Sequence, residues 1–178
     1  MIRPARLGDV DGQRAVERAA GARFSEIGLE EIADNEPMPA ETLAAYARSG
    51  RSWVATDPDD RVVGYVVVDI LGGHAHIEQV SVEPTHQGRG LGRALIDEVE
   101  RWATAQDLEA VTLTTFSDVP WNRPLYEHLG FQVIPPDRLS PGLRDLRDLE
   151  TAHGLDPDLR VCMQRPITRP NSPPGTST

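Results

Sequence analysis

A strand, a glycine-rich turn and an amphipathic helix follow one another between residues 74 and 105, and no other part of the 178-residue sequence constrains the fold as strongly. The stretch 74–82 predicts a strand that ends by Pro84, because proline cannot donate to a sheet ladder. The stretch 90–105 predicts a helix, since its apolar residues recur at helical spacing. That stripe consists of Leu91, Ala94, Leu95, Val99 and Trp102. The chain must therefore turn, through glycines, from a strand directly into a helix.

The turn itself has the composition of an anion-binding site. It comprises Gln87, Gly88, Arg89, Gly90, Leu91, Gly92 and Arg93. The first four N–H groups of a helix have no partner within the helix, and glycines let a bulky anion approach them. The arginines add positive charge that can bind phosphate oxygens in a forked geometry. These features predict a pyrophosphate site, although a turn that only packs a strand against a helix would show the same glycines.

Two better-known nucleotide motifs do not fit this turn. It lacks the glycine–lysine–Ser/Thr ending of an NTP-binding P-loop, and its spacing is G-x-G-x-G rather than G-x-G-x-x-G. An NTPase or a dinucleotide-binding fold is therefore not expected.

The remaining pattern predicts one mixed α/β (α+β) domain. Strands are expected at 2–5, 53–56, 62–70, 110–116, 131–134 and 159–164; helices are expected at 9–20, 41–49 and 141–153, with a short one around Leu125–Leu129. This order describes a mostly antiparallel central sheet flanked by helices, with one strand–helix–strand crossover. Residues 1–165 form the domain, and 166–178, with four prolines and few apolar residues, predict a disordered tail.

The composition indicates which classes of binding partner suit the chain. The net charge is −10, and all 18 cations are arginine. Such an acidic chain is unsuited to nucleic acid and better suited to a small cationic molecule. Cys162 is the only cysteine, which gives no disulfide or metal cluster and indicates a reducing, cytoplasmic location without a metal. No apolar run long enough for a membrane span and no signal-peptide pattern are found, so no membrane association is expected.

Two motifs carry a resemblance to a known family. Gln87-x-x-Gly90-x-Gly92, preceded by Val80-Ser81-Val82-Glu83-Pro84, resembles the acyl-CoA signature of the GNAT (Gcn5-related) N-acetyltransferase superfamily. Leu125-Tyr126-Glu127-His128-Leu129-Gly130-Phe131 is similar to a late motif of the same superfamily. The resemblance extends over roughly residues 2–165, and the order of the expected elements agrees with it.

The resemblance implies acetyl-CoA as co-substrate and direct attack of a primary amine on the thioester, without an acyl-enzyme. Strand residues Val80, Ser81 and Val82 would then pair with the pantetheine arm, and the turn from Gln87 to Arg93 would hold the pyrophosphate. Asn122 is a further candidate for a cofactor contact, although its place before Arg123-Pro124 also suits a helix N-cap. Homodimers are common in the superfamily.

Tyr126 matches the superfamily tyrosine that protonates the departing thiolate. A phenol with an ordinary pKa near 10 is a suitable donor to a thiolate of similar basicity. The same residue could also be a core aromatic whose hydroxyl is occupied elsewhere.

His76 and Glu78 are the candidates for the base that deprotonates the amine. They share one face of the predicted strand 74–82, at positions where superfamily members carry catalytic histidines or a glutamate. Either could act through a water molecule, and Glu78 could instead bind the cationic amine. Alternatively, His76 and Glu78 have no catalytic role and are half-exposed polar strand residues in a hydrogen-bonded network. His74, nearer the hairpin turn, is expected to be solvated.

The acceptor is harder to predict, because in this superfamily it binds to early and late loops, here 21–39 and 135–158. Aromatic walls (Phe24, Phe116 and Trp121) and acids (Glu26, Glu30, Glu31, Glu36 and Asp118) are candidates there. Val119 and Thr114 depart from the superfamily pattern, and Thr114 counts against ribosomal-protein acceptors. The sequence favours an N-acetyltransferase of a small cationic amine. A protein N-terminal or lysine acetyltransferase, or a non-catalytic acyl-CoA-binding module, stays open.

Overall fold

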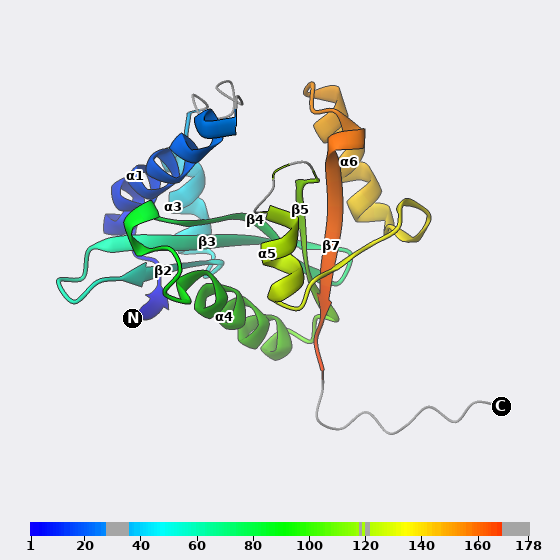
Figure 1. Cartoon of the computed structure of the whole chain (residues 1–178). Helices are drawn as coiled ribbons and strands as arrows, with labels where there is room; N and C mark the ends of the chain where they lie inside the picture. The colour runs from blue at the N-terminus through cyan, green and yellow to red at the C-terminus, as the bar shows by residue number, and fades with distance from the viewer. Residues whose placement is uncertain (28–35, 118, 120–121, 169–178) are drawn as a thin grey trace. The chain divides into compact units, whose positions relative to one another are not determined.

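The computed structural model describes residues 1–27, 36–117, 119 and 122–168. The chain divides into two compact units, one formed by Met1–Asp69 and His76–Val99 and the other by Ile70–Ala75 and the residues from Glu100 onward. Figure 1 shows the elements of both. No helix within the described ranges is long and apolar enough to cross a membrane.

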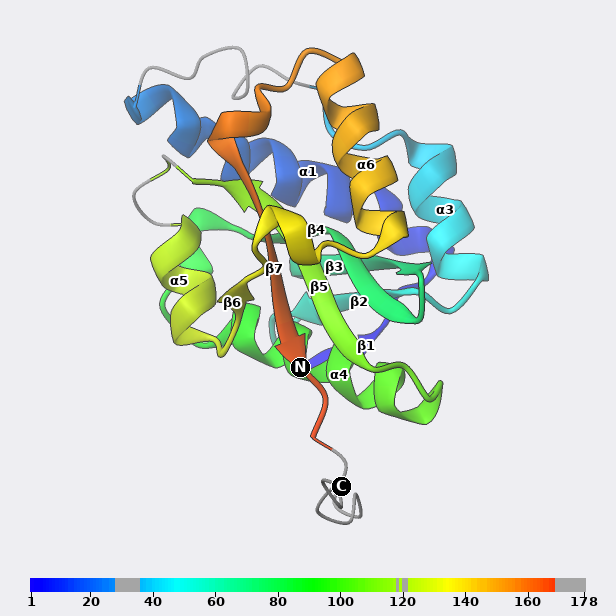
Figure 2. The same ribbon diagram turned by 90° about the vertical axis from the view of Figure 1, so that its right-hand side faces the viewer.

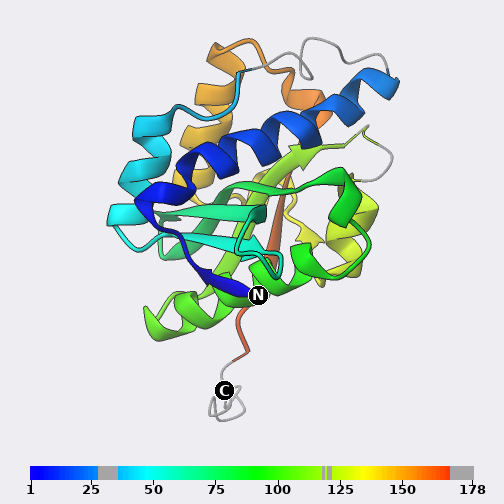
Figure 3. The same ribbon diagram turned by 90° about the vertical axis from the view of Figure 1, so that its left-hand side faces the viewer.

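The first unit is built on four neighbouring strands in the order β1-β2-β3-β4. They are β1 (Ile2–Pro4), β2 (Ser52–Thr56), β3 (Val62–Leu71) and β4 (His74–Val82). Strand β2 pairs antiparallel with β1 on one side and with β3 on the other. Its residue Val54 lies opposite Arg3 of β1 and opposite Tyr65 of β3. Helices α1 (Val10–Gly21) and α3 (Ala40–Arg48) lie on one side of these strands, and α4 (Leu91–Ala105) lies on the other (Figures 1 and 3).

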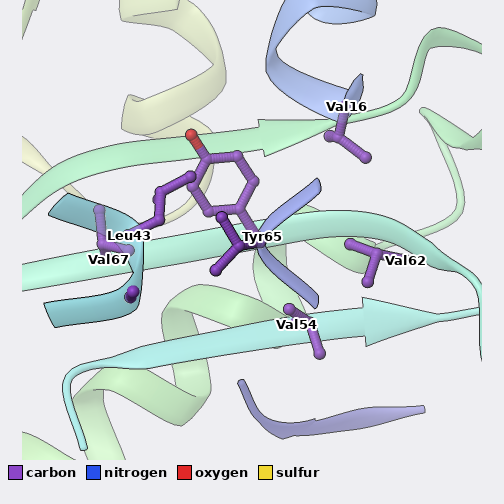
Figure 4. Close-up of a cluster of buried hydrophobic side chains, with 8 residues drawn as sticks. Val16, Leu43, Val54, Val62, Tyr65 and Val67 are labelled. Carbon is purple, nitrogen blue, oxygen red and sulfur yellow. The ribbon is translucent and has the colours of Figure 1, made fainter. Parts of the chain in front are cut away.

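The core under α1 and α3 holds β3 in place. Tyr65 and Val67 of β3 are fully buried and pack with Leu43 of α3 and Val16 of α1 (Figure 4). The Tyr65 hydroxyl donates to Glu17 Oε2 at 2.6 Å. Burial, with the nearby Glu17 charge, raises the pKa of Tyr65 far above its ordinary value, so this hydroxyl stays protonated. The polar tip of a buried aromatic therefore fastens α1 to the sheet.

The second unit contains three strands in the order β5-β7-β6. They are β5 (Ala110–Phe116), β6 (Gln132–Val133) and β7 (Arg160–Pro166), and β7 pairs antiparallel with both neighbours. Helices α5 (Asn122–His128) and α6 (Pro141–Ala152) complete it (Figure 2). Ile134, Leu139, Leu143 and Cys162 form its small core.

Short 3₁₀ turns connect these elements. They are η1 (Leu7–Asp9), η2 (Ala22–Ile27), η3 (Pro84–His86), η4 (Pro136–Arg138) and η5 (Pro157–Leu159).

The expected α/β class and every expected helix and strand are confirmed, with small differences at the ends. The boundary of the predicted tail is wrong by a short stretch: β7 extends to Pro166, opposite Ala110, and the Ile167 N–H donates to the Glu109 carbonyl. Proline is acceptable there because it ends the strand. Residues 169–178, the rest of the predicted tail, lie outside the described part of the chain.

An ion pair fixes the N-terminal strand to the start of the first helix. Arg3 binds both carboxylate oxygens of Asp9, at 2.7 and 3.0 Å, and both side chains are about nine-tenths buried. Burial alone would raise the pKa of Asp9, but the hydrogen bonds from Arg3 and from the Arg6 backbone outweigh it and lower the pKa below 3.8.

We expect Arg3→Met to lower the free energy of unfolding at pH 7 by about 2 kcal/mol, because a buried carboxylate loses its main partner. Urea unfolding measures this loss. Since the Asp9 pKa is depressed in the folded state, its stabilisation is present above the unfolded pKa near 3.8 and is lost as the pH falls through the lower folded value. The difference between wild type and variant should therefore shrink below pH 4.

Arg6→Met is the matched control, because Arg6 is exposed and reaches only an exposed Asp60 at 3.5 Å. This substitution should lower the free energy of unfolding by no more than about 0.5 kcal/mol. Equal losses in the two variants would contradict the assigned role of the buried pair.

Candidate active site

The glycine turn opens α4 with backbone donors that have no intrahelical partner. Gly88 and Gly90 have φ values of 74° and 77°, a left-handed conformation that other residues rarely adopt. The helix begins at Leu91, and its first backbone hydrogen bond closes from Ala94 N–H to the Gly90 carbonyl. Helical geometry leaves the N–H groups of the preceding turn available to an external acceptor.

The space in front of this turn is open. A Cβ atom built on Gly88, Gly90 or Gly92 would meet no atom within 4 Å. Arg89 and Arg93 are exposed on the same turn. Open glycines, the N–H groups of a helix N-terminus, the helix dipole and two arginines together fit a pyrophosphate. The residues present therefore suit the phosphates of coenzyme A.

Gln87 shapes the turn with its side chain. Its Nε2 donates to the Val82 carbonyl at 3.1 Å, and its Oε1 accepts from Arg23 at 2.8 Å. The carboxamide therefore ties the end of β4 to the turn and to η2, rather than being held ready for a phosphate. Arg23 was not anticipated from the sequence, because nothing in a residue 64 positions away marks it as a partner of Gln87.

The strand residues that are expected beside the pantetheine arm form the C-terminal end of β4. Val80 and Val82 are half-buried, whereas Ser81 is buried and its hydroxyl accepts from Gln79 at 2.8 Å. The Val82 carbonyl is occupied by Gln87, so the Ser81 hydroxyl and the Val82 carbonyl both have partners within the chain.

His76 and Glu78 lie on the same side of β4, as the alternation predicts. His76 Nε2 is 3.9 Å from Glu78 Oε1. The His76 side chain is only 3% exposed, whereas Glu78 keeps 30% of its side chain exposed. Glu78 can therefore meet a solvated amine, while His76 can act on one only through Glu78 or a water molecule.

Three residues that sequence reasoning missed lie beside this pair. The Tyr46 hydroxyl of α3 donates to Asp69 Oδ2 at 2.9 Å, and Arg51 donates to Asp69 Oδ1 at 2.8 Å while stacking over the Tyr46 ring. Burial, the hydrogen bond to Asp69 and the charges of Asp69 and Glu78 raise the Tyr46 pKa far above 10. An Asp near the end of a valine-rich strand was the available signal.

His74 differs from its prediction. Its side chain is only 16% exposed, and Nε2 is 3.7 Å from Glu109 Oε2, whereas Nδ1 is buried without a hydrogen-bond partner in the described residues. The expectation of a solvated histidine was wrong, because the strand end packs beside the residue before β5.

Tyr126 belongs to the second unit and lies on α5. It is half-buried, and its ring meets Phe131 edge-on with centroids 5.9 Å apart. Burial raises the pKa of Tyr126 to about 12, although the positive charge of Arg160 acts in the opposite direction. The phenol is therefore protonated at neutral pH, as a proton donor must be.

Asn122 is the first residue of α5, and its backbone N–H donates to the Val119 carbonyl at 3.1 Å. The capping hydrogen bond expected from its side chain is not seen among the described residues. Its contact with a cofactor stays a prediction.

The candidate acceptor residues are only partly described. Phe116 is half-buried beneath the Arg160 guanidinium, and Glu26 and Glu36 are exposed. Asp118, Trp121, Glu30, Glu31 and the side chain of Phe24 lie outside the described part. Within the described residues, no group of three or more His, Cys, Asp or Glu side chains is placed to hold a metal ion.

Comparison with known families matches most of the chain to an acetyltransferase family model. Residues 14–131 match the family described as "Acetyltransferase (GNAT) family". Among curated proteins, the chain is 27% identical over 156 residues to "N-alpha-acetyltransferase 40" of Saccharomyces cerevisiae, a match that spans 74% of this chain and 55% of that protein. It is 26% identical over 125 residues to "N-alpha-acetyltransferase RimI" of Mycobacterium tuberculosis, spanning 67% of this chain and 77% of that one. The chain thus matches only about half the length of the yeast relative.

Among solved structures, the fold resembles the "paia n-acetyltransferase" of Thermoplasma acidophilum in complex with coenzyme A. The TM-score is 0.71, with 15% identity over 93% of this chain and 98% of that one. At this identity the likeness concerns the fold.

We expect Gly90→Val to weaken coenzyme A binding by at least about 100-fold, because a branched side chain would fill the open space before the turn and strain its backbone. Gly50→Val is the matched control, since Gly50 has a φ of 70° and equally open surroundings after α3. Isothermal titration calorimetry of both folded variants compares them. Equal coenzyme A affinities of Gly90→Val and Gly50→Val would show that the turn is not part of the binding site.

Proposed function

Because the chain belongs to the acetyltransferase (GNAT) family, we propose that it transfers an acetyl group from acetyl-CoA to a primary amine. The observation that carries this proposal is the open, arginine-flanked turn at the start of α4. The backbone donors of a helix N-terminus and the open space before Gly88, Gly90 and Gly92 suit a pyrophosphate, which is the part of acetyl-CoA that such a turn binds.

Acetyl-CoA would be held by two adjoining segments. The turn from Gln87 to Arg93 takes the pyrophosphate, and Arg89 and Arg93 offset the negative charge that an acidic protein otherwise presents to a polyanion. Backbone groups of Val80, Ser81 and Val82 flank the pantetheine arm. Gln87 keeps the strand end and the turn in one geometry through Val82 and Arg23.

The reaction needs a base, an attacking nitrogen and an acid. A primary amine arrives as an ammonium ion, and Glu78 or His76 removes one proton, directly or through water. The nitrogen lone pair then forms a bond to the thioester carbonyl carbon, and the carbon–sulfur bond breaks. The departing thiolate takes the hydroxyl proton of Tyr126. The nitrogen loses its second proton as the amide forms, and that proton restores the Tyr126 hydroxyl, so that the products are an amide, free coenzyme A and one released proton.

Burial distinguishes the two candidate bases. Glu78 is exposed enough to contact the ammonium ion, and its negative charge favours a cation. His76 is enclosed and 3.9 Å from Glu78, so it suits a second role that orients the carboxylate or receives the proton. We therefore assign proton removal to Glu78, with His76 as its support.

Two acceptor classes remain in this proposal. The net charge of −10 and the partly exposed carboxylate of Glu78 favour a cationic small amine. The relatives named N-alpha-acetyltransferases favour the α-amino group of a peptide instead. A cytoplasmic location and a homodimer stay predictions.

Release of coenzyme A thiol from acetyl-CoA tests the proposal. The folded protein is mixed with acetyl-CoA and either polyamines and amino sugars or peptides with free N-termini, and the thiol is followed with a chromogenic disulfide. Turnover with one group assigns the acceptor class. Tight acetyl-CoA binding without thiol release for any amine would indicate a non-catalytic acyl-CoA-binding module.

We expect Tyr126→Phe to lower kcat by about 100-fold, because general acid catalysis typically contributes at least that much. The acetyl-CoA dissociation constant should change less than about threefold, since the phenylalanine ring keeps the packing against Phe131. Steady-state kinetics and calorimetry measure the two quantities. An unchanged kcat would exclude Tyr126 as the proton donor.

We expect Glu78→Gln to lower kcat by about 100-fold and His76→Gln by about tenfold, in keeping with a direct and a supporting part in proton removal. Glu109→Gln is the control, because Glu109 forms a comparable histidine contact, with His74, but is exposed and distant in sequence. A larger loss in His76→Gln than in Glu78→Gln would reverse the assignment.

A further inference from the structure

We propose that Arg23 of η2 binds the diphosphate of coenzyme A, together with the arginines that the glycine turn itself carries. The inference rests on the proposed function, in which the turn from Gln87 to Arg93 holds that diphosphate. Neither the glycine turn nor the late tyrosine motif includes Arg23, which lies 64 positions before Gln87. The observation behind it is a chain of two hydrogen bonds that connects Arg23 with the end of β4.

This chain passes through the Gln87 side chain. Arg23 NH1 donates to Gln87 Oε1 at 2.8 Å, and Gln87 Nε2 donates to the carbonyl of Val82, the last residue of β4, at 3.1 Å. Both ends of the carboxamide are therefore engaged, which fixes its orientation. The Arg23 guanidinium is thus held at the first residue of the turn, within one side-chain length of the strand end.

The Val82 carbonyl lies on the edge of β4 that faces away from β3. The residues on either side of it face β3. The Glu83 N–H donates to the Val63 carbonyl of β3 at 2.8 Å. A Cβ atom built on Gly64 of β3 would lie 3.1 Å from the Ser81 carbonyl oxygen. Because backbone groups of successive strand residues point to opposite edges, the Val82 carbonyl points to the other edge.

Arg23 therefore lies on the edge of β4 that a coenzyme would use. A pantetheine arm that pairs with backbone groups of β4 has to take the edge that β3 does not occupy. The diphosphate would lie before the turn, where a Cβ built on any of its three glycines meets no atom within 4 Å. Gln87 joins these two segments, so a diphosphate that leads from one to the other comes within reach of the guanidinium on its side chain.

The chemistry of arginine suits this position. A guanidinium carries five N–H donors in a planar fork that matches phosphate oxygens, and it keeps its charge at neutral pH. Its hydrogen bond to Gln87 orients the group without neutralising it, because an amide oxygen is uncharged. A polyanionic coenzyme needs local cations on a protein of net charge −10. Arg89 and Arg93 are exposed on the turn, and Arg23 adds a cation from a different element.

Calorimetric titration of the folded full-length chain with coenzyme A tests the assignment. We expect Arg23→Met to raise the dissociation constant by about tenfold, because a charge-assisted contact with phosphate is lost. Dephospho-coenzyme A, which lacks the 3′-phosphate but keeps the diphosphate, should show the same loss. A loss confined to intact coenzyme A would assign Arg23 to the 3′-phosphate and overturn the diphosphate contact.

A double-mutant cycle with Gln87 separates direct binding from an indirect effect. If Arg23 only held the Gln87 carboxamide in place, its removal would have no further effect once that carboxamide is gone. We expect Arg23→Met in the Gln87→Met chain still to raise the dissociation constant by at least about threefold. A smaller change in that background would overturn the direct contact.

Arg18→Met is the matched control, since Arg18 is an exposed arginine on α1 of the same unit. It should change the dissociation constant by less than about twofold, because an exposed charge away from the ligand is screened. Arg23→Gln, whose polar side chain suits a half-buried position, should show the same loss as Arg23→Met. Thermal unfolding of each variant measures structural damage. Equal losses in Arg18→Met and Arg23→Met would reduce the effect to net charge and overturn the inference.

The outcomes distinguish this inference from the proposed function. A folded wild-type chain that binds no coenzyme A would reject both. Wild-type affinity in Arg23→Met and Arg23→Gln would reject only the Arg23 contact, and the glycine turn would keep its proposed part in binding.

Discussion

The proposed binding of coenzyme A depends on the backbone N–H groups at the start of α4, which helical geometry leaves without a partner inside the helix. A helix N-terminus offers donors and a positive dipole, but only a chain without nearby side chains lets a diphosphate reach them. Gly88 and Gly90 meet that need through left-handed conformations, and Gln87 fixes the turn to β4 and to η2. Although the protein has a net charge of −10, the arginines of this turn make the electrostatic potential there locally more positive.

Burial differs among the ionisable side chains to which the proposed function gives roles. Glu78 keeps part of its carboxylate in contact with solvent, whereas His76 on the same strand is enclosed. Tyr126 is half-buried in the second unit, and its raised pKa keeps it protonated at neutral pH. A base that meets a solvated amine and an acid that retains its proton are what acyl transfer between a thioester and an amine requires.

Much of this could be predicted from the sequence. The apolar spacing of 90–105 predicted α4, and the glycines before it predicted an open turn, because both signals are local in the chain. The pairing of His76 with Glu78 followed from strand alternation. The Tyr46–Asp69–Arg51 cluster could not be predicted in the same way, since its members come from a helix, a strand and the segment between them and meet only through packing.

The sequence by itself determined the order of the elements, the place of the glycine turn before α4 and the chemical types of side chain available for the proposed proton transfer. Periodicity, turn residues and helix-end donors are properties of neighbouring positions. Only the tertiary structure decided that His74 is enclosed, that Gln87 is held by Arg23 and that Arg160 stacks on Phe116. Burial and charge–charge distance join residues far apart along the chain, so they exist only once strands and helices have packed.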